Sequence, residues 1–258
     1  MFLVLLTLMY TLKKSLGQHF LKDNAVSLRI VEAIREQPFQ QLLEVGPGGG
    51  AITAYLKDLP GVDFRAVELD HEKIVWLEKT YPDLKGRLVE GSILDMPVPF
   101  QSKFMLVGNF PYNISSQILF RVLDWKEQVS GLVGMFQKEV AQRVVAGPGS
   151  KDYGILSVLI QAYFQVTYLF DVEPEAFNPP PKVMSGVIRL YEAGNPFDIQ
   201  DDRKFRILVK AAFNQRRKQL RNPLKAYFSK EVLEQPIFTR RAEQLSVQDF
   251  VHLISLMT

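Results

Sequence analysis

Residues 107–115 (VGNFPYNIS) bring together an amide, a proline and a phenol that could act on an adenine base. The exocyclic amine of adenine has two hydrogens to donate and a weakly nucleophilic nitrogen. The side-chain carbonyl of Asn109 and the backbone carbonyl of Pro111 could accept those hydrogens, which would aim the nitrogen lone pair at a methyl donor. Proline suits this position because its fixed φ holds a carbonyl in place. Tyr112 could stack on the purine, at ~1 to 3 kcal/mol per base.

This chemistry needs no strong general base, because a sulfonium donor leaves as a neutral thioether and the proton can depart after transfer. Positioning would supply most of the rate. The alternative is a turn in which Asn109, Pro111 and Tyr112 only cap a strand and a helix. The segment follows a predicted strand at 104–108, where open α/β sheets build their active sites, and this location favours the catalytic interpretation.

A glycine cluster, residues 46–50 (GPGGG), lies between an apolar strand at 42–45 and a helical stretch at 51–59. This order lets a backbone approach a nucleotide cofactor closely. Glu68 ends the next strand, and a carboxylate there can accept both hydroxyls of a ribose. The glycine spacing fits NAD and S-adenosylmethionine equally. The Asn-Phe-Pro-Tyr segment favours S-adenosylmethionine.

Strand and helix patterns alternate along the first two thirds of the chain. Asn24 could cap a first helix, and later units pair strands with helices at 64–69 and 71–81, 104–108 and 114–125, and 131–136 and 138–145. Repeated units of this kind predict an α/β fold, with a parallel sheet and helices on both faces.

The pattern changes after residues 177–181 (FNPPP). A strand at 187–191 precedes a linker at 194–196, and the remainder reads as helices at 203–214, 218–228 and 247–257. Residues 203–225 hold nine basic side chains and no acidic one, although the whole chain has a net charge of only +3. A localised excess of cations is typical of a nucleic-acid surface.

Composition limits the other possibilities. The 258 residues are 47% hydrophobic and 23% charged, as in an ordinary folded protein. The absence of cysteine excludes disulfides, thiolate zinc sites and cysteine nucleophiles, and a cytosolic location fits it. Residues 1–12 are almost wholly apolar but too few to span a bilayer, which takes ~20 residues. We expect an N-terminal extension without a membrane role, and no metal site.

Seven ordered blocks of the chain resemble the KsgA family of ribosomal RNA adenine dimethyltransferases. The blocks are residues 16–21 (LGQHFL), 44–48 (EVGPG), 67–70 (VELD), 108–115 (GNFPYNIS), 137–143 (QKEVAQR), 177–183 (FNPPPKV) and 212–218 (AFNQRRK). The resemblance implies a Rossmann-like class I S-adenosylmethionine-dependent methyltransferase domain at 13–195 and a small C-terminal all-helical RNA-binding domain at 196–258.

The resemblance also assigns roles to individual residues. Phe177 would form the wall of the target-base pocket opposite Tyr112. Two positions depart from the common family pattern: the family usually has Asn at His19, and Asp at Ser92, where it would accept from the cofactor adenine. Asp95 is an alternative to that Asp, but we favour a surface turn for it. The cofactor site would comprise Gln18, His19, Leu21, Gly46, Gly48, Glu68, Ser92 and Asn109.

The implied activity is dimethylation of the N6 amines of two adjacent adenosines near the 3′ end of small-subunit (16S) ribosomal RNA, with a role in subunit biogenesis. We expect a cytoplasmic monomer that binds this RNA within a pre-ribosomal particle. Phosphate contacts would come from Arg216, Arg217, Lys218 and Arg221. Two alternatives remain: an assembly or nucleic-acid-binding factor with little catalysis, and a large-subunit RNA methylase that confers resistance. The 212–218 block and the continuation 113–115 favour the small-subunit family.

Overall fold

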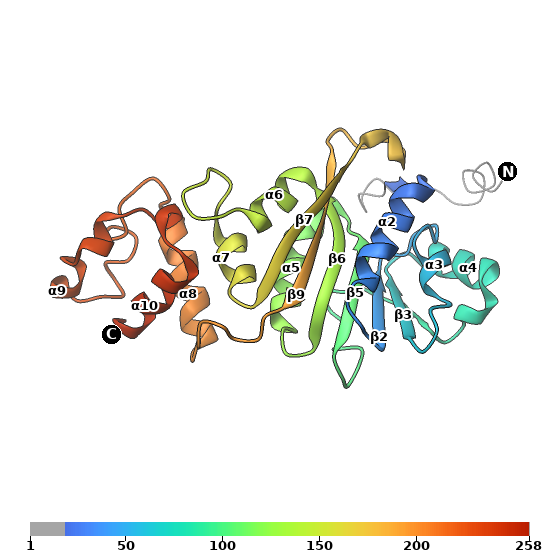
Figure 1. The fold of residues 1–258 in the computed structure, drawn as a ribbon, viewed down its shortest axis with the longest axis horizontal. Coiled ribbons are helices and arrows are strands. Elements are labelled where there is room, and N and C mark those ends of the chain that lie inside the picture. The colour runs from blue at the N-terminus through green and yellow to red at the C-terminus, as the bar shows by residue number, and fades with distance from the viewer. Residues whose placement is uncertain (1–18, 258) are drawn as a thin grey trace. The chain divides into compact units, whose positions relative to one another are not determined.

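A computed structural model describes residues 19–257, which form two compact units (Figure 1). The first contains the described residues up to Ala141 together with Thr167–Glu192, and the second contains Gln142–Val166 and the residues from Ala193 onward. Gln18 and the apolar residues 1–12 lie outside the described part. Within that part, no helix is long and apolar enough to cross a bilayer.

A seven-stranded sheet forms the centre of the first unit (Figure 1). Its order is β4 (Leu88–Glu90), β3 (Asp63–Glu68), β2 (Gln41–Val45), β5 (Phe104–Asn109), β6 (Val129–Gln137), β9 (Ser185–Glu192) and β7 (Phe164–Val172). The first five strands are parallel, but β9 runs antiparallel to β6, so the prediction of a wholly parallel sheet was wrong. The register between β6 and β9 explains the direction of β9. Ser185 pairs with Gln137, so β9 starts where the parallel strands end and runs back along them.

Both faces of the central strands β2 and β5 are buried, as the middle of a parallel sheet requires. Neighbouring side chains on a strand point to opposite faces, and both Leu42 and Leu43 are fully buried. Helix α2 (Asn24–Arg35) packs Ile30 and Ile34 into the same core cluster as Leu42. Helix α5 comprises Ser115–Asp124 and is capped by Trp125. The ring of Trp125 contacts that of Phe104, with 6.0 Å between centroids.

The predicted strands match the observed ones within two residues, whereas some helix ends differ. Helix α4 is His71–Thr80 and α6 is Lys138–Val145, close to or at their predicted bounds. The cap of α2 is Asp23, whose carboxylate accepts from the backbone of Ala25 and Val26, and not Asn24. Helix α3 is only Thr53–Leu56, because residues 47–52 are used in turns that begin with a bond from Gly50 N to Pro47 O.

A short two-stranded ladder lies beside the main sheet. Strand β1 (Phe20–Leu21) pairs antiparallel with β8 (Phe177–Asn178), which follows the 3-10 turn η4 (Pro174–Ala176). The other 3-10 turns of this unit are η2 (Pro82–Leu84) and η3 (Tyr112–Ile114). The ladder fixes the N-terminal end of the described chain against a segment about 160 residues later.

The second unit is helical. Its elements are α7 (Ile155–Gln161), α8 (Asp202–Asn214), α9 (Lys230–Leu233), η5 (Pro236–Thr239), η6 (Ala242–Gln244) and α10 (Val247–Ser255). The ring of Phe213 on α8 contacts Phe250 on α10 and Tyr153 before α7. The predicted helix at 218–228 was wrong, because this segment forms turns. It contains Pro223, and the amides of Leu220 and Arg221 bond to the carbonyls of Arg240 and Phe238 instead of forming a helix.

Gly134 on β6 packs directly against the Asn-Phe-Pro-Tyr segment. A Cβ at this position would overlap the ring of Phe110, which follows Asn109, and would lie 2.9 Å from Phe136. We predict that Gly134→Ala lowers the free energy of unfolding by about 1 to 3 kcal/mol, as overpacking of a dense core does. The measurement is urea unfolding. Gly147→Ala is the matched control, because nothing lies within 4 Å of its added Cβ. Equal stabilities of the two variants would contradict the prediction.

Candidate cofactor and substrate site

A cavity of about 780 Å³ opens at the carboxyl ends of β2, β3 and β5. This is the edge at which open α/β sheets bind their ligands, and the volume suits a small-molecule cofactor. Its lining includes the glycine cluster, the start of the described chain and the Asn-Phe-Pro-Tyr segment. Of the residues predicted to bind cofactor or substrate, those that line it are His19, Leu21, Gly46, Gly48, Glu68, Ser92, Asn109, Pro111 and Tyr112.

The glycine cluster shapes one side of this cavity. Gly46, Gly48 and Gly50 have φ values of 68°, 54° and 85°, which side-chain-bearing residues rarely adopt. At Gly48 a Cβ would also press on the ring of Phe20, at 3.1 Å. The backbone therefore turns sharply after β2 and can approach a bound molecule closely.

Glu68 lies at the end of β3 with its carboxylate held by the backbone. One oxygen accepts from Gly48 N at 3.1 Å and the other from Asp70 N at 3.0 Å. Burial raises the pKa of Glu68 above its usual value, although these backbone bonds oppose the shift. A carboxylate has about four acceptor sites, so the two bonds leave capacity for a ribose diol. The arrangement fits the predicted cofactor role.

Ser92 lines the cavity and also has a hydrogen bond within its own turn. Its hydroxyl accepts from Leu94 N at 3.1 Å, which begins a turn after β4. The hydroxyl keeps a hydrogen to donate and a second lone pair. Its role toward a cofactor adenine therefore stays a prediction.

Glu44 on β2 is a cavity residue that the sequence analysis did not single out as a site residue. It is 2% exposed and lines the cavity, and its Oε2 has no hydrogen-bond partner among the described residues. Burial raises its pKa to about 8, and the neighbouring Glu68 adds to the shift, while a bond with Thr53 opposes it. The signal in the sequence is a lone carboxylate inside an apolar strand (LLEV), since buried Glu is rare without a partner.

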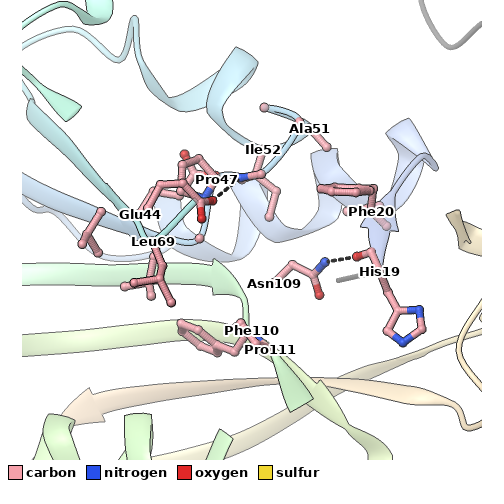
Figure 2. A pocket seen from close by; sticks show the side chains of 18 of the residues that line it. His19, Phe20, Glu44, Pro47, Ala51, Ile52, Leu69, Asn109, Phe110 and Pro111 are labelled. Atoms are coloured by element: carbon pink, nitrogen blue, oxygen red, sulfur yellow. Dashed lines mark hydrogen bonds between the residues drawn. The ribbon is translucent and has the colours of Figure 1, made fainter. Parts of the chain in front are cut away.

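Asn109 projects into the cavity from the end of β5 with a defined amide orientation (Figure 2). Its Nδ2 donates to the backbone carbonyl of His19 at 2.9 Å. This assignment places Oδ1 on the other side of the amide, where it stays free to accept. The carbonyl of Pro111 accepts from Ile114 N and from the Ser115 hydroxyl, each at 3.2 Å. Both lone pairs of this carbonyl are therefore used within the segment, and a further donor would have to replace one of the two.

Tyr112 is held at two places. Its hydroxyl lies 2.6 Å from Ser185 Oγ, and its ring stacks on the His19 imidazole with 5.5 Å between centroids and 30° between planes. Nδ1 of His19 in turn lies 2.9 Å from the carbonyl of Pro179. Burial raises the pKa of Tyr112, so the phenol is neutral and its ring can stack.

Phe177 does not lie where the sequence analysis expected a pocket wall. It is fully buried in the hydrophobic core, and the cavity is lined instead by its neighbour Asn178. Among the described residues, the aromatic ring found against Tyr112 is that of His19. A role for Phe177 beside a target base therefore stays a prediction, and it would require the ring to become exposed.

The predicted phosphate-binding residues all belong to the second unit. Arg217, Lys218 and Arg221 are exposed, and no ion pair with them is found among the described residues. Arg216 differs, because its Nη2 donates to the carbonyl of Lys151 at 2.6 Å and to that of Ser150 at 3.3 Å. Its guanidinium therefore supports the loop before α7.

The fold and site define a class I S-adenosylmethionine-dependent methyltransferase: a glycine loop after β2, a carboxylate after β3, and an Asn-Phe-Pro-Tyr segment after β5. Residues 9–258 match the model of the family described as "Ribosomal RNA adenine dimethylase". The chain belongs to this family.

Curated relatives agree with this assignment, and solved structures share the fold. Proteins from Parabacteroides distasonis (47% identity; 93% of this chain, 92% of the relative) and Bacteroides fragilis (48%; 93% and 90%) are both named "Ribosomal RNA small subunit methyltransferase A". A dimethyladenosine transferase from Plasmodium falciparum has a similar fold (TM-score 0.77, 24% identity; 92% of this chain, 96% of the other). So does the 23S rRNA methyltransferase ErmE (TM-score 0.67, 23%; 92% and 99%).

Glu44 gives a prediction about stability and pH. Because its pKa is about 8 in the folded protein and near 4.5 when exposed, the folded state binds the proton more tightly. The free energy of unfolding should therefore fall as pH rises from about 5 to 8, by up to about 1.4 kcal/mol per pH unit from this group. Glu44→Gln should remove that part of the decline. Denaturant unfolding of both proteins at several pH values measures it, and parallel curves would contradict it.

Proposed function

We propose that this protein transfers methyl groups to the N6 amines of two adjacent adenosines near the 3′ end of small-subunit ribosomal RNA. The observation that carries the proposal is the amide of Asn109. Its Nδ2 is committed to the His19 carbonyl, which leaves Oδ1 as an acceptor at the cavity for a group that donates hydrogens. An adenine amine is such a group, and Tyr112 beside it offers a surface for stacking.

Each residue then has a defined part in the reaction. When bound, S-adenosylmethionine supplies the methyl group as an electrophile. Glu68 would hold its ribose through acceptor capacity that the backbone bonds leave free. Asn109 Oδ1 and Pro111 O would accept the two amine hydrogens and so direct the nitrogen lone pair at the methyl. The amine proton can leave after transfer, so none of the residues needs to be a strong base.

The small-subunit target is supported by the curated relatives. Proteins 47% and 48% identical to this chain are named as small-subunit methyltransferases, whereas the large-subunit enzyme ErmE shares 23% identity, which concerns the fold alone. The blocks 113–115 and 212–218 favour the same target. We therefore prefer this activity to large-subunit methylation. A non-catalytic assembly factor would not need the orientation of Asn109.

We further propose that the protein acts as a cytoplasmic monomer on a pre-ribosomal particle. The exposed cations of the second unit support the RNA particle as the target, since ribosomal RNA in a particle presents dense phosphate. Arg217, Lys218 and Arg221 would contact phosphates, and Arg216 would act in part by holding the loop at Ser150 and Lys151.

Substitutions of Asn109 and Glu68 should affect different quantities: the first methyl transfer, and the second cofactor affinity. Asn109→Ala should abolish methyl transfer while cofactor affinity stays within a few-fold: Asn109 is among the predicted cofactor-site residues, but its free Oδ1 is assigned to the substrate amine. Glu68→Gln should weaken cofactor binding by roughly tenfold or more, since hydrogen bonds to charged groups contribute about 1.5 to 3 kcal/mol. The measurements are calorimetric cofactor titration and single-turnover transfer to unmethylated small subunits. Near wild-type turnover of Asn109→Ala would exclude the catalytic assignment.

The cations give a prediction about salt. Replacing Arg217, Lys218 and Arg221 together with Gln should weaken binding to small subunits and flatten its salt dependence, by roughly 0.7 to 0.9 in log-log slope per lost phosphate contact. Cofactor affinity should not change, because these residues do not line the cavity. Binding is measured at several salt concentrations. Arg203→Gln, on the same basic segment but outside the proposed set, is the control, and an unchanged slope in the triple variant would refute the assignment.

A further inference from the structure

Ser185 is a buried polar residue that has a contact with the proposed substrate site but does not line the cavity. It is fully buried at the first position of β9, and its hydroxyl lies 2.6 Å from that of Tyr112, which is 73 residues earlier in the chain. A buried hydroxyl is costly unless it is hydrogen-bonded, and this bond provides the partner. The contact therefore connects the sheet core to the ring that is proposed to receive the base.

The position of Ser185 is set by a regular part of the sheet. Strand β9 pairs with β6 from Ser185 opposite Gln137 to Tyr191 opposite Gly131 without a register shift. Tyr112, in contrast, lies in a 3-10 turn that follows Pro111 and has no side-chain cap. The rigid strand thus provides a fixed point for a side chain on a less regular segment.

His19 provides the second contact of the same ring. The two rings are already in stacking contact at 5.5 Å, so a base cannot lie between them. Nδ1 of His19 is itself within hydrogen-bond distance of Pro179 O, which holds the imidazole in this place. A base that stacks on Tyr112 without displacing His19 is left with the opposite face of the ring.

We propose that Ser185 is a positioning residue for methyl transfer. Its hydroxyl fixes the end of the Tyr112 side chain and His19 covers one face, so that the other face meets the target adenine at the distance from Asn109 that transfer requires. The inference rests on the proposed function, because it takes Tyr112 as the surface on which the base stacks. It adds a residue that contacts neither substrate nor cofactor.

The test is a double-mutant cycle on the bond between the two hydroxyls. Ser185→Ala and Tyr112→Phe each remove one hydroxyl and keep the rest of the site. We expect each to lower kcat/KM for unmethylated small subunits by about threefold to tenfold, as for loss of one hydrogen bond. We expect the double variant to be no worse than either single variant. Cofactor affinity should be unchanged in all three, because Ser185 lies outside the cavity lining and Tyr112→Phe keeps the ring that lines it.

Two results would overturn the inference. If Ser185→Ala lowers kcat/KM by the same factor in the Tyr112→Phe background, the serine acts through another contact. If Tyr112→Phe has wild-type kcat/KM, the bond has no role, and this single variant leaves β9 untouched in case the serine change impairs folding. Tyr112→Ala separates the two levels of the proposal. If Tyr112→Ala is inactive while the effects of Ser185→Ala and Tyr112→Phe on kcat/KM are additive, only the role of Ser185 is contradicted. If Tyr112→Ala is fully active, the stacking role of Tyr112 is contradicted as well.

His19 is tested separately by keeping or removing its ring. His19→Phe retains an aromatic surface against Tyr112, and His19→Ala removes it, while both leave the backbone carbonyl that holds Asn109. We expect kcat/KM for the RNA to fall at least threefold further in His19→Ala than in His19→Phe, at equal and saturating cofactor. Equal values in the two variants would contradict the contribution of ring contact.

Discussion

The hydrogen bond from Asn109 Nδ2 to the backbone carbonyl of His19 is the contact on which the substrate site depends (Figure 2). It decides which end of the amide is a free acceptor, and only the oxygen end can receive an amine hydrogen. The carbonyl is in place because the next two residues pair with Phe177 and Asn178 in the β1–β8 ladder. Two segments that are far apart in the chain must therefore pair before the Asn-Phe-Pro-Tyr segment presents a free acceptor oxygen.

The cavity combines this acceptor with two carboxyl groups of different character. Glu68 has bonds from two backbone amides and is suited to bind hydroxyl groups. Glu44 is buried, one of its oxygens has no hydrogen-bond partner in the part of the chain that the structure describes, and burial raises its pKa to about 8. Burial in a poorly solvated site raises both pKa values. A cationic cofactor such as S-adenosylmethionine would favour their ionised forms, so the site gains charge complementarity when it is filled.

Local sequence features indicated many of the helices and strands, although not β4, β7 or α7, and many of the residues that line the cavity. The glycine cluster, Glu68 and the Asn-Phe-Pro-Tyr segment all line one cavity, as their positions after successive strands predicted. Errors arose where a long-range contact outweighed the local pattern. Residues 218–228 have helical spacing, but their amides bond to Phe238 and Arg240, and β9 is antiparallel because of where it enters the sheet.

By itself, the sequence determined most of the chemical groups at the site, although not Glu44, because strand, glycine turn and helix patterns depend on neighbours a few residues apart. Only the tertiary structure decided how those groups are oriented. Phe177 is buried, and His19 stacks on Tyr112. Ser185 on β9 contacts the phenol hydroxyl of Tyr112. Gln142–Val166 groups with the helical unit. These arrangements follow from strand register and from packing between segments far apart in the chain, and no local pattern of residues encodes either.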